Sequence, residues 1–140
     1  MQSDDPTVIR VLAIHTDDIV SALEANARRD VGAVLRVTPP FTGRMRARIH
    51  LAGRESPYGD PAPLHVEPER LVDAPAFPDP DTTEDELRAD PDASYSSERH
   101  RERHEAAVAA WRRAVRDAIR DRATIETLQG PHEVEVRRLG

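Results

Sequence analysis

The segment Arg44–Leu51, RMRARIHL, has the clearest periodicity in the 140-residue chain and decides its fold class. Apolar and basic residues alternate along it, so the two kinds of side chain point to opposite faces of the backbone. A period of two predicts a β-strand that buries its apolar face and exposes its arginines. Met45, Ala47, Ile49 and Leu51 form the apolar face, and Arg44, Arg46, Arg48 and His50 form the other.

The segments on the N-terminal side of this strand add a helix and two further strands. Residues 7–14 and 33–37 are short β-branched runs that predict strands. Between them, residues 16–30 have apolar side chains at helical spacing, with Thr16 as the expected N-cap. The proline-rich turn at residues 38–43 (TPPFTG) separates the second strand from Arg44.

A long helix and a hairpin are predicted near the C-terminus. The helix covers residues 96 to about 122, and Val108, Trp111 and Val115 fall on one apolar stripe along it. We therefore expect Trp111 to be buried. Residues 125–128 and 133–137 predict the two strands of the hairpin, and residues 64–66 predict a further short strand.

This order of elements, β-α-β-β-(β)-linker-α-β-β, predicts a single α+β domain over residues 1–140. Its sheet should be mostly antiparallel, with the helices packed on one face. Residues 1–6 lack periodicity and are expected to be flexible. Residues 73–95 form a Pro- and Asp-rich connector, either wrapped or mobile, in which Thr83–Glu86 can cap one short turn.

The composition restricts both chemistry and location. The absence of cysteine excludes disulfides, thiolate metal sites and cysteine nucleophiles. There is no signal-peptide pattern at the N-terminus and no apolar run long enough to span a membrane, so we expect a cytoplasmic protein without a membrane partner. All 20 basic residues are arginine, against 26 acidic residues, and the net charge is −6. An acidic, lysine-free chain favours a halophilic source, and a GC-rich genome is the alternative explanation.

A family resemblance points the same way. The stretch from Asp18 to Val72 contains TPPFTGRMRARIH at residues 38–50 and PLHVEPERLV at residues 63–72. Together with the lysine-free composition, it resembles an uncharacterised small protein family of halophilic archaea. The resemblance covers less than half of the chain and implies a habitat, but no activity.

The arginines of the central strand are the first candidate site. Arg44, Arg46 and Arg48, joined by Arg36 from the preceding strand, present guanidinium groups about 7 Å apart, a spacing that matches successive phosphates or carboxylates. This pattern favours an anion or nucleic-acid surface, with Phe41 and Tyr58 as the nearby aromatic residues for base stacking. The alternative is a solvated face whose arginines pair with Glu67, Glu133 or Glu135 of neighbouring strands.

Two histidine-containing patterns are weaker candidates. His100 and His104 have the i, i+4 spacing of two metal ligands, but flanking arginines repel a cation and favour a plain charged helix end. His15 stands beside Asp17 and Asp18, which suggests acid–base chemistry. The position of the two aspartates in the first turn of a helix explains them without catalysis.

These observations predict a non-catalytic cytoplasmic binding protein without a cofactor. Its expected partner is nucleic acid or another polyanion, bound through Arg36, Arg44, Arg46 and Arg48. The alternative is a protein–protein interaction module that self-associates, for example as a homodimer. A metal-dependent enzyme ranks third among the hypotheses. It ranks last because no nucleophile–base pair is visible in the sequence.

Overall fold

The structure is a computed structural model that describes residues 2–51 and 61–140, and it confirms the α+β class. Within these residues there are one six-stranded sheet and three α-helices, of which the strands and two helices follow the predicted order and the third helix lies in the predicted connector. In chain order the elements are η1 (Pro6–Val8), β1 (Val11–His15), α1 (Thr16–Arg29), β2 (Ala33–Val37), β3 (Arg44–Leu51), β4 (Leu64–Val66), η2 (Pro68–Arg70), α2 (Pro80–Ala89), α3 (Ser97–Asp117), β5 (Arg122–Thr127) and β6 (Gly130–Leu139).

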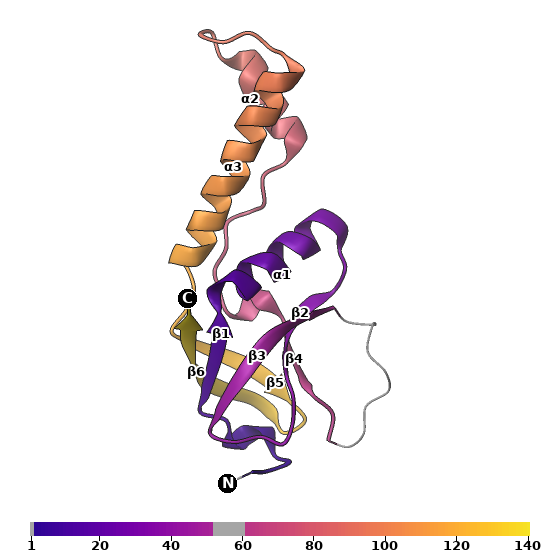
Figure 1. The fold of residues 1–140 in the computed structure, drawn as a ribbon, viewed down its shortest axis with the longest axis vertical. Helices are drawn as coiled ribbons and strands as arrows, with labels where there is room; N and C mark the ends of the chain where they lie inside the picture. The colour runs from indigo at the N-terminus through magenta and orange to yellow at the C-terminus, as the bar shows by residue number, and fades with distance from the viewer. Residues whose placement is uncertain (1, 52–60) are drawn as a thin grey trace. The chain divides into compact units, whose positions relative to one another are not determined.

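The sheet has the strand order β4-β2-β3-β1-β6-β5 and is mostly antiparallel, as predicted. The exceptions are the two pairs made by β1, which runs parallel to both β3 and β6. The strands at the two ends of this order, β4 and β5, also contact each other. The sheet is therefore strongly curled around its apolar side (Figure 1).

Helix α1 covers the apolar side of the sheet through contacts with β1, β2 and β3. Its residues Ile19, Ala22 and Leu23 are buried, which confirms the predicted apolar stripe. The helix ends where Asp30 adopts a left-handed conformation, with φ of 50°. Asn26 then fixes the start of β2, because its side chain exchanges two hydrogen bonds with the backbone of Ala33 at 2.9 and 2.7 Å.

The described chain divides into two compact units, one of Met1–Asp73 with Ala118–Gly140 and one of Ala74–Asp117. In the second unit α2 packs against α3. Trp111 is buried there, as predicted, together with Val108 and Val115. Its ring meets Phe77 edge-on at 4.9 Å between centroids, and its Nε1–H donates to the Pro75 carbonyl at 2.9 Å.

The connector at residues 73–95 contains more helix than the expected single turn. Helix α2 begins at Pro80, and the side chain of Asp79, not Thr83, caps it by accepting from the Asp81 N–H. Proline fits the first helical position because its missing N–H needs no partner there. The prediction failed because a capping box at Thr83–Glu86 lies inside the helix that Pro80 starts.

The junction between α3 and β5 also differs from its prediction. The helix ends at Asp117 instead of about residue 122, and β5 begins at Arg122 instead of residue 125. Backbone pairing with a distant segment explains the difference. Ile119 forms a bridge with Val72, and the Arg120 N–H donates to the Leu71 carbonyl at 2.9 Å. This pairing overrides the local helical spacing.

The N-terminal boundaries shift for similar reasons. Ser3 lies in the segment that was expected to be flexible, yet its backbone exchanges two hydrogen bonds with Phe41, at 2.8 and 2.7 Å. The run at residues 7–14 begins as η1, capped by Asp5, and becomes strand only at Val11. Thr16 is the first residue of α1 and not its cap, and its hydroxyl donates to the Gly140 carbonyl at 3.0 Å.

Candidate polyanion-binding face

Strand β3 presents three arginines on the side of the sheet opposite to the core. In the register with β1, Arg44 lies beside Val11 and Arg46 beside Ala13, so these side chains share one face. Arg48, two residues further along the strand, points the same way. Arg44 and Arg48 are exposed and Arg46 is half-buried.

Strand β2 adds a fourth arginine to this face. Arg36 is half-buried and lies directly opposite Arg48 in the antiparallel register. On its other side it pairs with His65 of β4, and the ring of His65 lies 5.7 Å from that of His50. We call Arg36, Arg44, Arg46 and Arg48 the arginine face. Arg36 has other contacts, so the argument below rests on the three arginines of β3.

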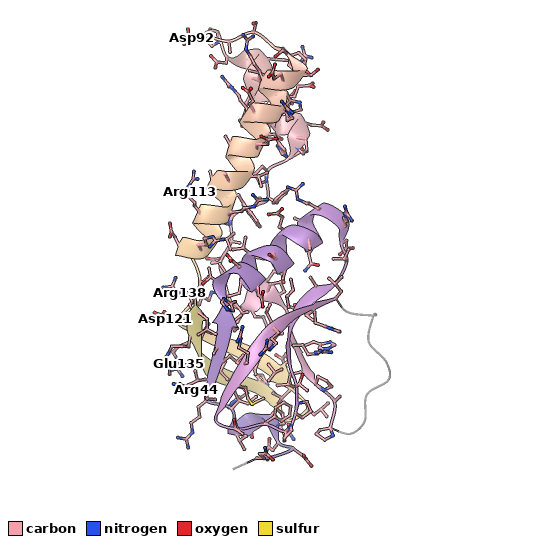
Figure 2. All side chains as sticks on the ribbon, viewed as in Figure 1. Arg44, Asp92, Arg113, Asp121, Glu135 and Arg138 are labelled. Carbon is pink, nitrogen blue, oxygen red and sulfur yellow. The ribbon has the colours of Figure 1, made fainter. Side chains whose placement is uncertain are left out.

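The glutamates of β6 are not direct cross-strand neighbours of the β3 arginines. Strand β1 stands between them, so Arg44 is in register with Val11, and Val11 in turn with Glu135 (Figure 2). Two strand spacings place the backbones of β3 and β6 about 10 Å apart. The side chains between them, Val11 and Ala13, are short and uncharged.

The same glutamates already have partners. Glu133 binds Arg122 and Glu135 binds Arg137, at 3.0 Å in the second pair. Within residues 2–51 and 61–140, no hydrogen bond or ion pair involves the side chains of Arg44, Arg46 or Arg48. The alternative expectation was that Glu67, Glu133 or Glu135 pairs with the arginines of β3. Among the described residues none of the three glutamates does so, and Glu133 and Glu135 pair with Arg122 and Arg137 instead.

Arg46 has a buried donor without a partner. Its Nε is buried and makes no hydrogen bond among the described residues. Leaving a buried donor unsatisfied costs about 1–3 kcal/mol.

The charge on this side of the sheet is opposite in sign to that of the whole chain. The strand register places six arginines on this side of the sheet: the four of the arginine face, Arg122 and Arg137. It places three glutamates there: Glu126, Glu133 and Glu135. The face thus has a surplus of positive charge on a protein whose net charge is −6. The remaining surface is correspondingly more acidic.

The aromatic residues predicted to accompany the arginines do not form a stacking surface. Phe41 is 1% exposed, so its ring packs in the core and cannot receive a base. It is buried because the turn at residues 38–43 folds back onto Ser3. Tyr58 lies outside the described residues.

The two histidines of α3 hold α2 in place. His100 Nε2 lies 2.8 Å from the Pro80 carbonyl, which can only accept, so this nitrogen is the donor. His104 Nδ1 lies 3.3 Å from the Thr83 hydroxyl, which itself donates to the Asp79 carbonyl. No group of three or more potential metal ligands occurs in the part of the chain that the structure describes. Contacts between α2 and α3 account for the histidine spacing.

The aspartates beside His15 also have structural roles. Asp18 Oδ2 accepts from the backbone N–H of Ile49 at 3.3 Å, which ties the first turn of α1 to β3. Asp17 has contacts of its own. A carboxylate at a helix N-terminus is favoured by the helix dipole, so neither residue needs a catalytic explanation.

Two carboxyl groups outside the arginine face have clearly shifted pKa values. Hydrogen bonds from the side chain and backbone of Thr7 lower the pKa of Asp5 below its ordinary value. The pKa of Asp90 is lowered chiefly by its hydrogen bond from Arg103. Both shifts reflect caps and ion pairs of exposed residues, not a reactive centre.

Comparison with known proteins places the chain in a family. The model of one family, a domain of unknown function, matches residues 1–140. Searches of curated proteins and of solved structures found no match. Among the described residues, no helix is long and apolar enough to cross a membrane. Because the family model covers the whole chain, the protein belongs to the DUF8009 family.

Proposed function

We propose that the protein is a non-catalytic binding protein whose arginine face binds an extended polyanion, with a phosphodiester chain as its expected form. The observation that carries the proposal is the row of three β3 arginines without carboxylate partners. An arginine in a sheet normally gains from a cross-strand carboxylate. Here the nearest strand on one side offers Val11 and Ala13 instead.

The spacing of these arginines suits a linear ligand. Alternate residues of a strand lie about 7 Å apart, so successive guanidinium groups can meet successive phosphates of one strand. Each guanidinium has five donors in a planar fork and can bind a phosphate through two parallel hydrogen bonds. The short side chains of Val11 and Ala13 leave room for the ligand beside the arginine row.

Self-association is supported less well than polyanion binding. The large apolar side chains that are exposed among the described residues, Ile49, Tyr95 and Leu128, come from different elements and do not suggest a contiguous apolar patch. The β5 edge of the sheet is partly covered, because Arg70 donates to the Thr124 carbonyl at 3.3 Å. A mass that rises with protein concentration would favour self-association instead.

The variant that replaces Arg44, Arg46 and Arg48 by alanine should lose most of its affinity for single-stranded nucleic acid. The plot of log affinity against log salt should become shallower by about three, roughly one for each phosphate contact removed. Fluorescence anisotropy with labelled DNA and RNA oligonucleotides across a potassium chloride series measures both quantities. The variant should remain folded, since these side chains point away from the core.

A charge-matched control separates a specific face from general electrostatics. Replacing Arg29, Arg101 and Arg113 by alanine removes the same charge from exposed positions of α1 and α3. This control should keep the wild-type affinity and slope. Equal losses in the two triple variants, or no binding at the lowest salt at which the protein is folded, would refute the proposal.

A halophilic, cytoplasmic origin follows as part of the proposal, and it predicts that folding depends on salt. The chain has 26 acidic residues against 20 arginines, so salt should relieve repulsion across its surface. The melting temperature, followed by circular dichroism, should rise steadily with potassium chloride concentration. A native spectrum and an unchanged melting temperature at low salt would contradict salt adaptation.

A further inference from the structure

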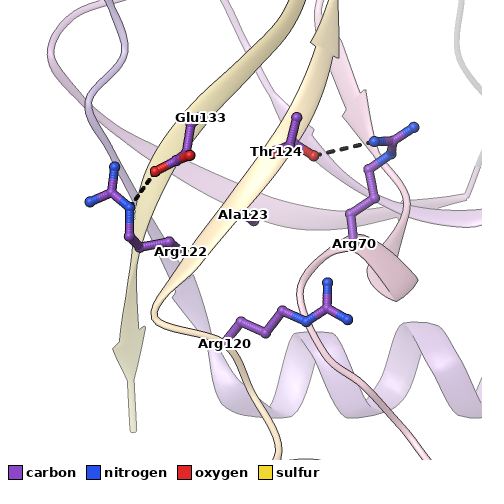
Figure 3. A pocket seen from close by; sticks show the side chains of 6 residues that line it. All are labelled: Arg70, Arg120, Arg122, Ala123, Thr124 and Glu133. Atoms are coloured by element: carbon purple, nitrogen blue, oxygen red, sulfur yellow. Dashed lines mark hydrogen bonds and ion pairs between the residues drawn. The ribbon is translucent and has the colours of Figure 1, made fainter.

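A second cluster of arginines lies at the edge of the sheet, apart from the arginine face. Arg70 of η2, Arg120 before β5 and Arg122 of β5 line a pocket of about 360 Å³, together with Ala123, Thr124 and Glu133 (Figure 3). None of the three β3 arginines lines this pocket. Sequence reasoning missed it, because residues 118–122 looked like the end of a helix.

Backbone contacts hold two of these arginines at the pocket. The Arg120 N–H donates to the Leu71 carbonyl, next to Arg70 in the chain. Leu71 is fully buried, which anchors the segment between them. The side chain of Arg70 is also fixed, because its Nη1 donates a hydrogen bond to the Thr124 carbonyl of β5. The pocket wall is thus set by the fold and not by side-chain flexibility alone.

Each of the three pocket arginines has one carboxylate within 3.9 Å, but only the pair of Arg122 is close. Glu133 is the single carboxylate among its described lining residues, and it already binds Arg122. The nearest carboxylate oxygens to the other two arginines are Glu126 Oε1, 3.7 Å from Arg70, and Asp73 Oδ1, 3.9 Å from Arg120. Both distances exceed a hydrogen bond, so these pairs contribute little. Guanidinium donors of Arg70 and Arg120 therefore remain available.

We infer that this pocket binds a small phosphate-bearing anion through Arg120 and Arg70, with Arg122 adding charge at its margin. Guanidinium forks match the geometry of tetrahedral oxyanions better than that of simple halides. The site is an open depression at the sheet edge, whereas the arginine face presents a row of donors along a strand. The inference thus goes beyond the proposed function and stands on different residues.

Titration of inorganic phosphate into the ¹⁵N-labelled full chain, with total ionic strength held constant by potassium chloride, tests the site. Saturable shifts of the amide signals of Arg120, Ala123 and Thr124 are expected. Arg120→Ala should weaken binding at least tenfold, and Arg120→Gln, which retains the length of the stem, should weaken it as strongly. Both variants retain the backbone N–H that donates to Leu71.

The controls distinguish this site from the arginine face. Arg29→Ala, at an exposed position of α1, and the triple β3 variant should both retain wild-type phosphate affinity. Loss of phosphate binding in the triple variant would instead assign the anion to the arginine face. Shifts that drift without saturating, or that persist unchanged in Arg120→Ala, would overturn the inference while leaving the test with oligonucleotides intact.

Discussion

Replacing Trp111 by alanine is expected to lower the free energy of unfolding of the Ala74–Asp117 unit by about 3–5 kcal/mol, as for other large buried aromatics. Trp111 is 5% exposed and provides the edge-to-face contact with Phe77. Its removal leaves a cavity beside α3 and leaves the Pro75 carbonyl without its donor. A unit of this size has few other large side chains with which to fill that cavity.

Hydrogen exchange of the α2 and α3 amides, followed by NMR, measures this effect within the unit itself. Protection should fall sharply in Trp111→Ala. Trp111→Phe should have an intermediate effect, because it retains a ring but loses the Nε1–H. The exposed residue Arg113 on the same helix supplies the control, since Arg113→Ala should leave protection unchanged. Wild-type protection in Trp111→Ala would mean that the ring is not part of a core.

Phe41→Ala is expected to destabilise the other unit by a similar amount, about 3–5 kcal/mol. The Phe41 ring is 1% exposed and is the largest of the fully buried side chains. Its backbone also holds Ser3 through two hydrogen bonds, so a collapsed turn would release the N-terminal segment. The loss therefore combines a cavity with a weakened bridge between distant parts of the chain.

Urea denaturation gives the free energy of unfolding for this comparison. Leu128→Ala removes an aliphatic side chain that is fully exposed, and it should change that free energy by less than about 0.5 kcal/mol. The folded Phe41→Ala protein should bind oligonucleotides as the wild type does, since a buried ring cannot stack on a base. If the folded Phe41→Ala protein bound oligonucleotides more weakly than the wild type, Phe41 would have to be counted among the binding residues.

Features encoded by local periodicity could be predicted from the sequence. The alternation in Arg44–Leu51 predicted the strand and the shared side of its arginines, but on the apolar side only Ala47 is buried and Ile49 is 38% exposed. The stripe on α3 predicted the burial of Trp111. Features that depend on distant pairing could not be predicted in this way. The sequence of residues 118–122 contains no local signal for their pairing with Leu71 and Val72. The predicted helix therefore extended through residues 118–122.

The candidate site divides along the same line. The projection of Arg44, Arg46 and Arg48 to one side follows from a period of two. Whether these arginines have carboxylates as cross-strand neighbours depends on the order of the strands in the sheet. The order of the strands along the sequence does not determine that order. The parallel insertion of β1 between β3 and β6 separates Arg44 from Glu135. The pocket at Arg120 arises from a tertiary contact and had no local signal.

The bridge between Val72 and Ile119 has a consequence for how such a protein can change in evolution. It brings together the two points where the chain leaves the sheet-containing unit and returns to it, so Ala74–Asp117 is an insertion with adjacent ends. An insertion of this kind can lengthen, shorten or be exchanged while the host keeps its strand order. Relatives would then be expected to differ most in the length of the Ala74–Asp117 unit.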